Sequence, residues 1–577
     1  MSSNLIKPSI LSHSPKSFIS VLRSYGITKF HVHFNRKTGR VMASHPVLQP
    51  IGDYFVQEGI DFDKHEGIFG QIGPKSGVLQ GAFAHRTCRG AAAGGVRNWS
   101  YNSIEDWFRD GIRLSRGMTH KNALAELWWG GGKGVIARNS GVGLEEGASP
   151  LQRRLVFEEY GLFISSLKGC YVTAEDVGTK DEDMSAIFSK TRFITCIPPE
   201  YGGSGNPSSP TARGVVRALE AAFSHIGRKS LEGATIAVQG VGHVGSNFIQ
   251  FLLEKRVNHI IACDVDPQKI QVAKKRFREF CDERVEFRLT KQDDRSILYE
   301  DVDAVSPCGI GNILTPQTIK DIKAKIICGA ANNQLGDPAK DDKLLAERGI
   351  IYVPDFLANR MGIVNCADEQ YGYIDSDPFV EKHLGDSWEN SIYNCTKLIL
   401  DKAKVTKRTP QEIAIELAEQ KSFIEHPIRG HRGIQIIESK ISNKTYIKLS
   451  NMSSQETDRF KSSLLTDAEI VELRARQRTF EGAYWRTCLS SFGFAFIILR
   501  IFEKDFYAIG FVYVAFGGAL LIISALRRRD YFDIFDKNKP FVTSGGYVAL
   551  TSSIALLTYL ALLILISRLD SPNTKVQ

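Results

Sequence analysis

The chain has 577 residues, of which 43% are hydrophobic and 24% are charged, and its 73 basic and 64 acidic residues give a net charge of +9. This composition excludes a disordered or collagen-like protein, and the charge excess is too small for this length to indicate nucleic-acid binding. The 10 cysteines form no Cys-x-x-Cys pair and no metal-ligand spacing with histidine. We therefore expect free thiols in a reducing compartment, no bound metal, and three or four packing units.

The first 52 residues contain seven Lys or Arg and no Asp or Glu, a composition typical of a mitochondrial presequence. However, residues 29–34 (KFHVHF) alternate like a strand, which leaves only about 25 residues for such a presequence. We therefore expect an N-terminal extension over residues 1–26 and a first domain from residue 27. Mitochondrial targeting is the less favoured alternative.

Three segments of the first domain contain candidate catalytic residues: RGMTHKNA at 116–123, GGGKG at 130–134 and TAEDVG at 173–178. We interpret the three glycines before Lys133 as removing side chains that would keep a ligand away from its amine. A charged Lys121 in a buried cleft would lower the pKa of Lys133 and make it a base near neutrality, and Asp176 would exchange protons with a substrate nitrogen. The alternative for each lysine alone is a solvated surface cation.

A dinucleotide-binding pattern follows the strand expected over residues 234–239 (ATIAVQ) and precedes a helical segment. The first glycine of such a pattern makes a tight turn, the second lets the backbone approach the pyrophosphate, and the third lets the helix pack on the strand. The alternative is a glycine-rich turn without a ligand. The pattern here consists of Gly240, Val241, Gly242, His243, Val244 and Gly245.

An acidic residue ends the next predicted strand, at residues 259–263. Asp264 lies 24 positions after Gly240, where a carboxylate accepts from a ribose 2'-hydroxyl and repels a 2'-phosphate, so NAD is favoured over NADP. Two further strands, one ending at Ala304 and one at 325–328 (KIIC), continue a parallel sheet. We expect the small residues after them to rim the cofactor crevice: Ser306, Pro307, Cys308 and residues 329–333.

Several segments occur together in one order from about Gly81 to Ile437. Besides those above they are AAAGGVRNW at 91–99, GSGNPSSPTARGV at 203–215, SPCGIGNIL at 306–314, GAANNQL at 329–335 and YVPDFLAN at 352–359. In this order they resemble the amino-acid dehydrogenase family that includes the leucine, phenylalanine, valine and glutamate enzymes. The resemblance implies reversible NAD-dependent oxidative deamination of an L-amino acid to its 2-oxo acid and ammonia, in a cleft between two domains.

The resemblance also implies roles for individual residues. Lys121 would hold the substrate carboxylate, Lys133 would act as general base for the attacking water, and Asp176 would move protons at the amino group. Gly94 and Gly95 would line the carboxylate site. Thr211, Asn332 and Asn333 would lie beside the nicotinamide, and Ala93, Ile363 and Cys366 would lie at the side-chain pocket.

The substrate predicted from these residues is an aliphatic or aromatic amino acid, because the pocket residues are small or apolar and TAEDVGT resembles the leucine and phenylalanine branch. A departure from the family pattern occurs at residues 359–362, which read Asn-Arg-Met-Gly and would place two bulky side chains beside this pocket. The alternatives are a glutamate dehydrogenase, or a membrane-anchored sensor that binds NAD or an amino acid without turnover.

The predicted fold is α/β, with a catalytic domain over 27–203 and a Rossmann-like NAD domain over 204–364. Helices over 365–438 would return to pack on the catalytic domain. Gly202, Gly203 and Gly205 would form a hinge for closure of the cleft. Because the family usually assembles through its first domain, we expect a homo-oligomer.

The C-terminal part of the chain differs from the rest in amino-acid composition. Residues 439–463 are polar and Ser-rich and are typical of a linker. Within residues 464–577 lie three apolar stretches, Thr487–Phe502, Phe506–Leu526 and Tyr547–Ser567, which predict spans of a lipid bilayer. The alternative is a set of buried core helices.

Basic residues before the first stretch and between the second and third place the dehydrogenase part on the cytoplasmic side of a membrane. They are Arg474, Arg476, Arg478, Arg486, Arg527, Arg528, Arg529, Lys537 and Lys539. Residues 478–489 (RTFEGAYWRTCL) with the three spans resemble a small membrane domain found alone in bacteria and at the C-terminus of vacuolar polyphosphate transporter chaperones. We interpret this tail as an anchor. A fusion of two neighbouring reading frames would give the same sequence.

Overall fold

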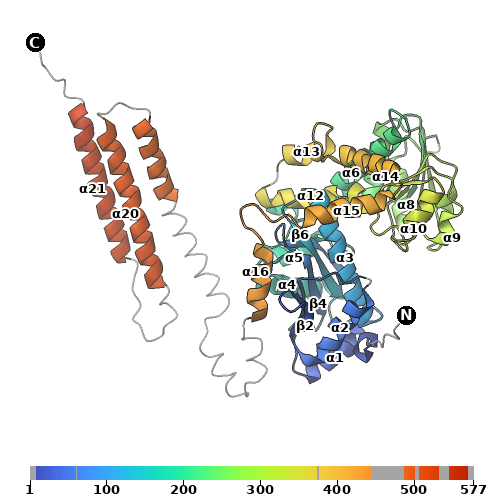
Figure 1. Cartoon of the computed structure of the whole chain (residues 1–577), viewed down its shortest axis with the longest axis horizontal. Coiled ribbons are helices and arrows are strands. Elements are labelled where there is room, and N and C mark those ends of the chain that lie inside the picture. The colour runs from blue at the N-terminus through green and yellow to red at the C-terminus, as the bar shows by residue number, and fades with distance from the viewer. Residues whose placement is uncertain are drawn as a thin grey trace, which may run out of the picture. The chain divides into compact units, whose positions relative to one another are not determined.

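The computed structural model describes residues 8–442 except 60, 282, 373 and 375, and residues 486–500, 506–531 and 545–569. The chain divides into two compact units, Met1–Ser450 and Asn451–Gln577. The first unit contains two β-sheets with helices packed on them, and the second is helical where it is described (Figure 1).

The first sheet has seven strands in the order β2-β1-β3-β4-β6-β5-β7. β5 pairs in parallel with β6 and β7, and the other neighbours are antiparallel. The strand expected over residues 29–34 is confirmed as β1. The strands are β1 (Lys29–Asn35), β2 (Arg40–Ala43), β3 (Gly67–Ile72), β4 (Leu79–Arg86), β5 (Ala92–Trp99), β6 (Gly130–Ala137) and β7 (Tyr171–Glu175).

Helices cover both faces of this sheet. They are α1 (Pro15–Ser24), α2 (Gln49–Glu58), α3 (Ile104–Leu124), α4 (Pro150–Ser166) and α5 (Asp181–Phe188), with short 3-10 helices η1 (Ser9–Ser12), η2 (Pro46–Leu48) and η3 (Pro199–Tyr201). α3 begins with a capping box between Ser103 and Asp106 and buries Trp107 in the same core as Phe83 of β4. This packing fixes the helix whose last turn carries Lys121.

Residues 8–26 are part of the first domain rather than a separate extension. Phe18 and Leu22 of α1 are buried in the same core as Phe30 of β1. Burial of these apolar side chains stabilises the segment on the sheet. The first domain therefore includes residues that we assigned to an N-terminal extension.

The second sheet has six parallel strands in the order β10-β9-β8-β11-β12-β13. In chain order this is 3-2-1-4-5-6, the doubly wound arrangement that binds dinucleotides at the point where the strand order reverses. The predicted parallel Rossmann-like sheet is therefore confirmed. The strands are β8 (Thr235–Gln239), β9 (His259–Asp264), β10 (Val285–Leu289), β11 (Ala304–Pro307), β12 (Ile326–Ile327) and β13 (Ile351–Tyr352).

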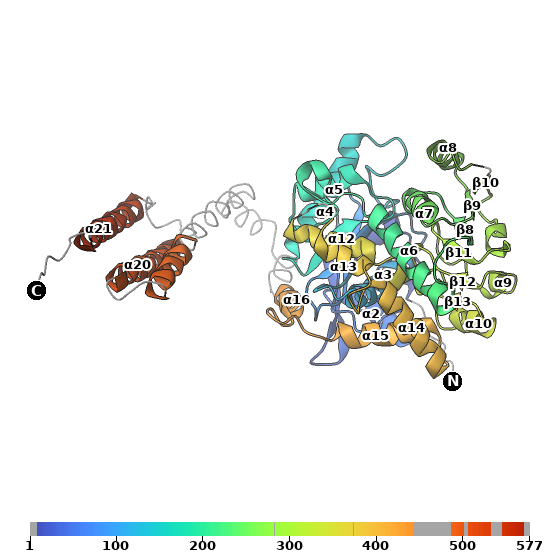
Figure 2. The same ribbon diagram turned by 90° about the horizontal axis from the view of Figure 1, so that it is seen from above.

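Helices lie on both faces of the second sheet, as Figure 2 shows. α6 (Ser208–His225), α7 (His243–Glu254) and α8 (Pro267–Arg276) share a core with Ile236 and Val238 of β8. α9 (Pro316–Ile319), α10 (Asp341–Glu347) and the 3-10 helix η4 (Ser296–Tyr299) lie on the face of Ala237. Because side chains alternate along β8, its neighbouring residues belong to different cores.

The helices after the second sheet divide their contacts between the two domains. They are α11 (Asp355–Ala358), α12 (Met361–Asp368), η5 (Glu369–Tyr371), α13 (Pro378–Leu384), α14 (Ile392–Thr406), α15 (Pro410–Ser422) and α16 (Arg432–Ser442). α15 packs on α3, and α16 buries Ile437 beside Phe69 of the first sheet. α14 packs instead on α6 of the second domain, because its apolar face matches that of α6.

The second unit contains helical residues 486–500, α20 (Tyr507–Tyr531) and α21 (Gly545–Leu569). Among the described helices, two segments are long and apolar enough to cross a membrane, Tyr507–Leu526 and Gly546–Arg568. At Gly517 of α20 a Cβ atom would lie 3.1 Å from the Phe492 ring, so the glycine permits close packing of residues 486–500 on α20.

Several expectations about this end of the chain fall on residues that the structure does not describe. They concern the linker from residue 443 to 463 and Phe502 at the end of the first apolar stretch. They also concern the side chains of Arg474, Arg476, Arg478, Arg527, Arg528, Arg529, Lys537 and Lys539.

Candidate active site

A cleft of about 1410 Å³ lies between the two domains of the first unit. Residues of the first domain that line it include the lysine and acid candidates, and residues of the second domain include the glycine loop before α7. The structure thus brings together segments that are distant in sequence. The predicted site residues on the lining are Gly95, Lys121, Lys133, Asp176, Thr211, Gly242, His243, Val244, Cys308, Asn332, Asn333, Ile363 and Cys366.

Lys133 and Asp176 form a buried ion pair that lines this cleft. Lys133 lies in β6 and is 4% exposed, and Asp176 directly follows β7. The two strands lie on either side of β5, so their side chains converge. The Nζ atom of Lys133 is 2.9 Å from Oδ2 of Asp176, and Nε of Arg97 is 3.3 Å from the same oxygen.

The charged residues of this cluster shift one another's pKa values. Burial lowers the pKa of Lys133, Asp176 opposes this, and Arg97 adds to it. Among the cations, Arg97 therefore has the largest effect on the pKa of Lys133, whereas we expected that cation to be Lys121. Burial raises the pKa of Asp176, but Lys133 and Arg97 outweigh it and lower the pKa to about 2. Asp176 is therefore ionised at neutral pH, and Lys133 is the group closer to releasing a proton.

Lys121 lies in the last turn of α3 and donates a hydrogen bond from Nζ to Oδ1 of Asn332, 3.1 Å away. The same amide oxygen accepts from Nδ2 of Asn359 at 2.8 Å. Burial lowers the pKa of Lys121 to about 8, with Lys133 adding to the effect and Asp355 opposing it. This ammonium contacts a neutral oxygen rather than a carboxylate, so it retains capacity to bind an anionic ligand group.

The three glycines before Lys133 serve packing rather than ligand access, which corrects our interpretation of them. A Cβ atom on Gly130 would overlap the carbonyl oxygen of Arg86, and one on Gly131 would overlap Thr119 of α3. A Cβ atom on Gly132 would lie 2.7 Å from the Tyr171 ring. The glycines therefore let α3 and neighbouring strands approach β6 closely.

The glycines of the loop before α7 fit the roles that dinucleotide binding requires. Gly240 has a φ of +97°, a left-handed conformation that permits the tight turn. A Cβ atom at Gly242 would meet nothing within 4 Å, whereas one at Gly245 would overlap the carbonyl oxygen of Gly240. Because Gly242 has no side chain, nothing at this position obstructs the first backbone N–H groups of α7. Such N–H groups at a helix N-terminus attract phosphate. These residues therefore fit a bound dinucleotide.

Asp264 supports this loop from the end of β9. Its Oδ2 accepts a hydrogen bond from the backbone N–H of Val241 at 2.9 Å, and Oδ1 accepts from that of Asp266 at 3.0 Å. Asp264 is 9% exposed. In this structure it therefore ties the strand end to the glycine loop.

Ser306, Pro307 and Cys308, which we expected to follow β11 and rim the crevice, are placed differently from the prediction. The strand begins at Ala304 instead of ending there, so Ser306 and Pro307 lie inside it. The Ser306 hydroxyl is buried and donates to the carbonyl oxygen of Cys328 at 2.7 Å. Cys308 is the member of this set that lines the cleft. Short apolar segments give little information about where a buried strand begins, which explains the error.

The other predicted residues of the first domain lie behind the lining. A Cβ atom on Gly94 would overlap the carbonyl oxygen of Gly132, and its own carbonyl oxygen accepts from the Tyr171 hydroxyl at 2.7 Å. Ala93 is 1% exposed and belongs to the hydrophobic core. Of the glycine pair, Gly95 is the one that reaches the cleft.

Arg360 and Met361 do not crowd the substrate pocket, so that prediction is wrong. Both are 0% exposed, and among the described residues neither lines the cleft. The Arg360 guanidinium donates to the backbone carbonyl oxygens of Leu124 and Asn390. Met361 packs against Gly214 of α6. The unusual Asn-Arg-Met-Gly segment therefore joins helices and leaves the cleft open.

Sequence reasoning missed the charged residues that hold Asp176. Besides its contact with Asp176, Arg97 pairs with Asp110, with NH1 3.0 Å from Oδ1. The hydroxyl of Tyr101 donates to Oδ2 of Asp110 at 2.6 Å. Arg97 lies in the segment AAAGGVRNW, which we had already singled out in the sequence. The presence of an arginine in that segment was therefore the available signal. Two cations and two carboxylates thus balance in a poorly solvated site.

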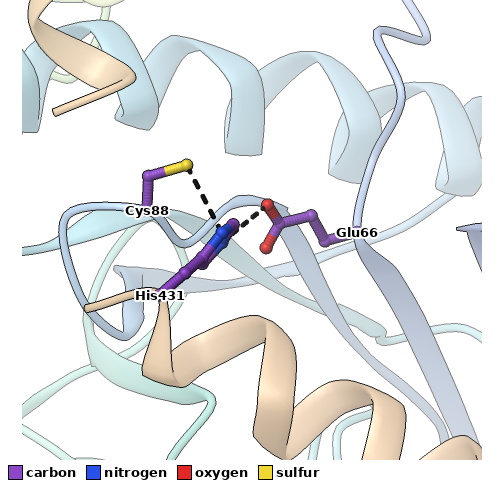
Figure 3. A group of neighbouring side chains, drawn as sticks. All are labelled: Glu66, Cys88 and His431. Atoms are coloured by element: carbon purple, nitrogen blue, oxygen red, sulfur yellow. Dashed lines mark hydrogen bonds and ion pairs between the residues drawn. The ribbon is translucent and has the colours of Figure 1, made fainter. Parts of the chain in front are cut away.

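One group of potential metal ligands lies away from the cleft, formed by Glu66, Cys88 and His431. Figure 3 shows the imidazole between the other two side chains. Its Nε2 is 3.1 Å from Oε1 of Glu66, and its Nδ1 is 3.7 Å from Sγ of Cys88. Arg36 also forms an ion pair with Glu66. The carboxylate therefore already has cationic partners, and the group ties the segment before α16 to the first sheet.

The two-domain fold and the cleft with a buried lysine, a carboxylate and a glycine loop at a helix N-terminus define the class of dinucleotide-dependent oxidoreductases. Residues 75–193 match the Glu/Leu/Phe/Val dehydrogenase dimerisation domain, and residues 202–424 match the Glutamate/Leucine/Phenylalanine/Valine dehydrogenase family.

Named relatives agree with these matches. The chain is 42% identical over 313 residues to a leucine dehydrogenase of Bacillus subtilis (strain 168), covering 54% of this chain and 80% of the relative. It is 37% identical over 309 residues to a phenylalanine dehydrogenase of Lysinibacillus sphaericus, covering 53% and 77%. Among solved structures, L-tryptophan dehydrogenase from Nostoc punctiforme has a TM-score of 0.50 and 31% identity, covering 64% of this chain and 98% of that one. The chain belongs to the Glu/Leu/Phe/Val dehydrogenase family and is an enzyme of that family, which uses NAD(H).

Proposed function

We propose that the chain catalyses the reversible oxidative deamination of an aliphatic or aromatic L-amino acid with NAD, while its C-terminal helices tether it to a membrane. The observation that carries the catalytic part is the buried Lys133 amine, 2.9 Å from Asp176 in the cleft that also contains Lys121 and the Gly242 loop.

Each charged residue has a distinct task in this reaction. The Lys121 ammonium binds the substrate carboxylate in place of its contact with Asn332 and so orients Cα. Bound NAD would supply the acceptor for the hydride that leaves Cα. Lys133, whose pKa is lowered by burial, takes a proton from the water that attacks the resulting imino carbon. Asp176 returns a proton to the amino nitrogen of the resulting carbinolamine, so that the C–N bond breaks and ammonia leaves with the 2-oxo acid. Lys133 and Arg97 keep the Asp176 carboxylate ionised for this exchange.

The proposed substrate class rests on the pocket beside these residues. Gly95, Ala174, Ile363 and Cys366 line the cleft and offer small or apolar surfaces. Such surfaces favour aliphatic or aromatic side chains over the γ-carboxylate of glutamate. The relatives named above are dehydrogenases of leucine, phenylalanine and tryptophan, and they support the same class.

The experiment that tests the catalytic proposal follows NADH absorbance while the full chain, in detergent, is mixed with NAD and a panel of L-amino acids. We expect reduction with at least one aliphatic or aromatic amino acid. Turnover with glutamate alone would instead support a glutamate dehydrogenase. Binding of NAD and amino acids without NADH formation for every substrate would support a sensor.

The tether is proposed from the two apolar segments Tyr507–Leu526 and Gly546–Arg568, each long enough to span a bilayer. Membranes from cells that produce the full chain should retain it after washing at high salt and alkaline pH. A chain that ends at residue 442 should be released into the soluble fraction. Release of the full chain under the same conditions would contradict the proposal.

A further inference from the structure

Two cysteines meet where the first domain joins the helices of the second. Sγ of Cys196 lies 3.1 Å from Sγ of Cys366, and the two side chains are almost fully buried. Cys196 follows Ile194, which pairs with Thr173 of β7, and it precedes Gly202, Gly203 and Gly205, which we expect to act as a hinge. Cys366 lies in α12. The pair therefore connects two parts of the chain that must move if the cleft closes.

The two sulfur atoms lie close to bonding distance. A disulfide has an S–S distance of about 2.05 Å, so the sulfur atoms need to approach by only about 1 Å. Cys196 has a φ of +60°, in the left-handed region that non-glycine residues rarely adopt. A cysteine therefore occupies a position whose backbone favours glycine, and it directs its thiol at Cys366.

The two thiols differ in access and in charge environment. Cys366 lines the cleft, which is open to water-sized molecules, and a thiolate there is attracted by the Lys121 ammonium. Cys196 lies behind it, and its contact with Cys366 together with burial raises the pKa of its thiol. Cys366 is thus the thiol that an oxidant in the cleft meets first, and Cys196 is the one positioned to react second.

We propose that hydrogen peroxide entering the cleft drives formation of a reversible disulfide between Cys366 and Cys196, and that this bond switches off turnover. In the first step the Cys366 thiolate attacks one peroxide oxygen, the O–O bond breaks, and the sulfur is oxidised to a sulfenic acid while hydroxide leaves and is protonated to water. In the second step the Cys196 sulfur displaces the sulfenic hydroxyl, and its thiol proton leaves with that hydroxyl as water. A thiol reductant restores both cysteines.

The loss of turnover follows from the position of the bond and rests on the proposed function. α12 packs on α6 of the second domain, whereas Cys196 belongs to the end of the first domain. Glu369, just after α12, already accepts hydrogen bonds from the backbone N–H groups of Ile197 and Ser204. A covalent bond added to these contacts would fix the segment that carries the hinge glycines, and it would also move Cys366 in the pocket wall. Closure of the cleft would then be impeded.

The test treats the full chain in detergent with hydrogen peroxide and maps its peptides by mass spectrometry without reduction. We expect a peptide pair joined through Cys196 and Cys366, and turnover at least about tenfold lower, both reversed by dithiothreitol. In Cys196→Ser, oxidised Cys366 has no partner and proceeds to the sulfinic acid, so the loss should resist dithiothreitol. Cys281→Ser, which alters a partly exposed thiol of the second domain, should behave as the unmodified chain does.

Some outcomes would overturn the proposal. One is peroxide inactivation without the joined peptides, and another is full recovery of Cys196→Ser by dithiothreitol. A joined peptide pair without loss of turnover would overturn the switch while leaving the bond. Absence of turnover in the reduced chain with every amino acid would refute the proposed function, but peptide mapping would still test the disulfide.

Discussion

Two glycine-rich segments of this enzyme, residues 130–132 and 240–245, contain glycines for different physical reasons. At Gly240 the reason is local, because the turn requires a left-handed backbone, and at Gly242 the space above the backbone is open. At Gly130 to Gly132 the reason is tertiary, because any side chain would strike a neighbouring strand, helix or ring. Residues 240–245 prepare a surface for a ligand, whereas residues 130–132 let the protein pack behind Lys133.

This comparison extends to the two domains. In the proposed function the first domain supplies the proton-transfer groups Lys133 and Asp176, and the second domain supplies the Gly242 loop that would bind the cofactor. Changes in the first should therefore affect turnover or stability without affecting NAD binding. Changes in the loop should affect NAD binding without affecting the fold.

The largest effect is expected from Lys133→Ala. Loss of the general base should reduce turnover by about 10²- to 10⁴-fold, because proton transfer from the attacking water then lacks its acceptor. NAD affinity, measured by calorimetry or by NADH fluorescence in the reverse direction, should stay unchanged, since the loop lies in the other domain. Lys274→Ala, which removes an exposed lysine of α8, is the matched control and should retain turnover. An active Lys133→Ala chain would refute the assignment of the base.

A stability effect is expected from Gly131→Ala. The added methyl group would meet the backbone of α3 at Thr119 and Ser115, which cannot rotate away as a side chain does. Such overpacking typically costs about 1–3 kcal/mol. The unfolding temperature of the first unit should fall by several degrees in a thermal scan. An unchanged unfolding temperature would mean that α3 accommodates the methyl group, and the packing reason for these glycines would be wrong.

Gly242→Ala should give the converse result. A methyl group here meets no protein atom within 4 Å, so the free energy of unfolding should change by no more than about 0.5 kcal/mol, as for a neutral surface substitution. NAD binding should weaken by about tenfold, or ~1.4 kcal/mol, because the methyl group would stand where the pyrophosphate approaches the backbone. Titration of NADH fluorescence measures this directly. Unaltered affinity would remove Gly242 from the cofactor site.

Much of the second domain was predictable from sequence because its signals are local. The strand into Gly240, the helix after it and the acid at Asp264 each follow from neighbouring residues, and the sheet order confirms their context. The start of β11 was not predictable in this way, because a short apolar segment has no boundary residue of its own. There the hydrogen-bonding register with β8 decides where the strand lies.

In the first domain the candidate residues were found, but the reasons for their arrangement were not. Lys121, Lys133 and Asp176 lie on α3, on β6 and after β7, and sequence spacing says nothing about how these elements pack. Arg97 was missed as the partner of Asp176 for the same reason. Arg360 was misjudged because its buried contacts with Leu124 and Asn390 are made across long sequence separations.

The smallest effect in this series concerns the pH dependence of anion binding by Lys121. Its pKa is lowered to about 8, so the ammonium is present below that pH and is lost as the pH rises through it. Affinity for a 2-oxo acid should therefore be highest below pH 8 and should weaken about fivefold between pH 8 and pH 9, as the charged fraction falls from about a half to a tenth. A 2-oxo acid is the suitable ligand because, unlike the amino acid, it has no amino group that titrates in this range.

Lys121→Met is the control that assigns this pH dependence. The variant should bind the 2-oxo acid weakly and with little change from pH 7 to pH 9, because no group at this position titrates. If the unmodified chain binds equally well at pH 7 and pH 9, Lys121 does not supply the charge. If the variant retains the fivefold change, the titrating group is another one, and Lys133, 4% exposed in the same cleft, is the next to test.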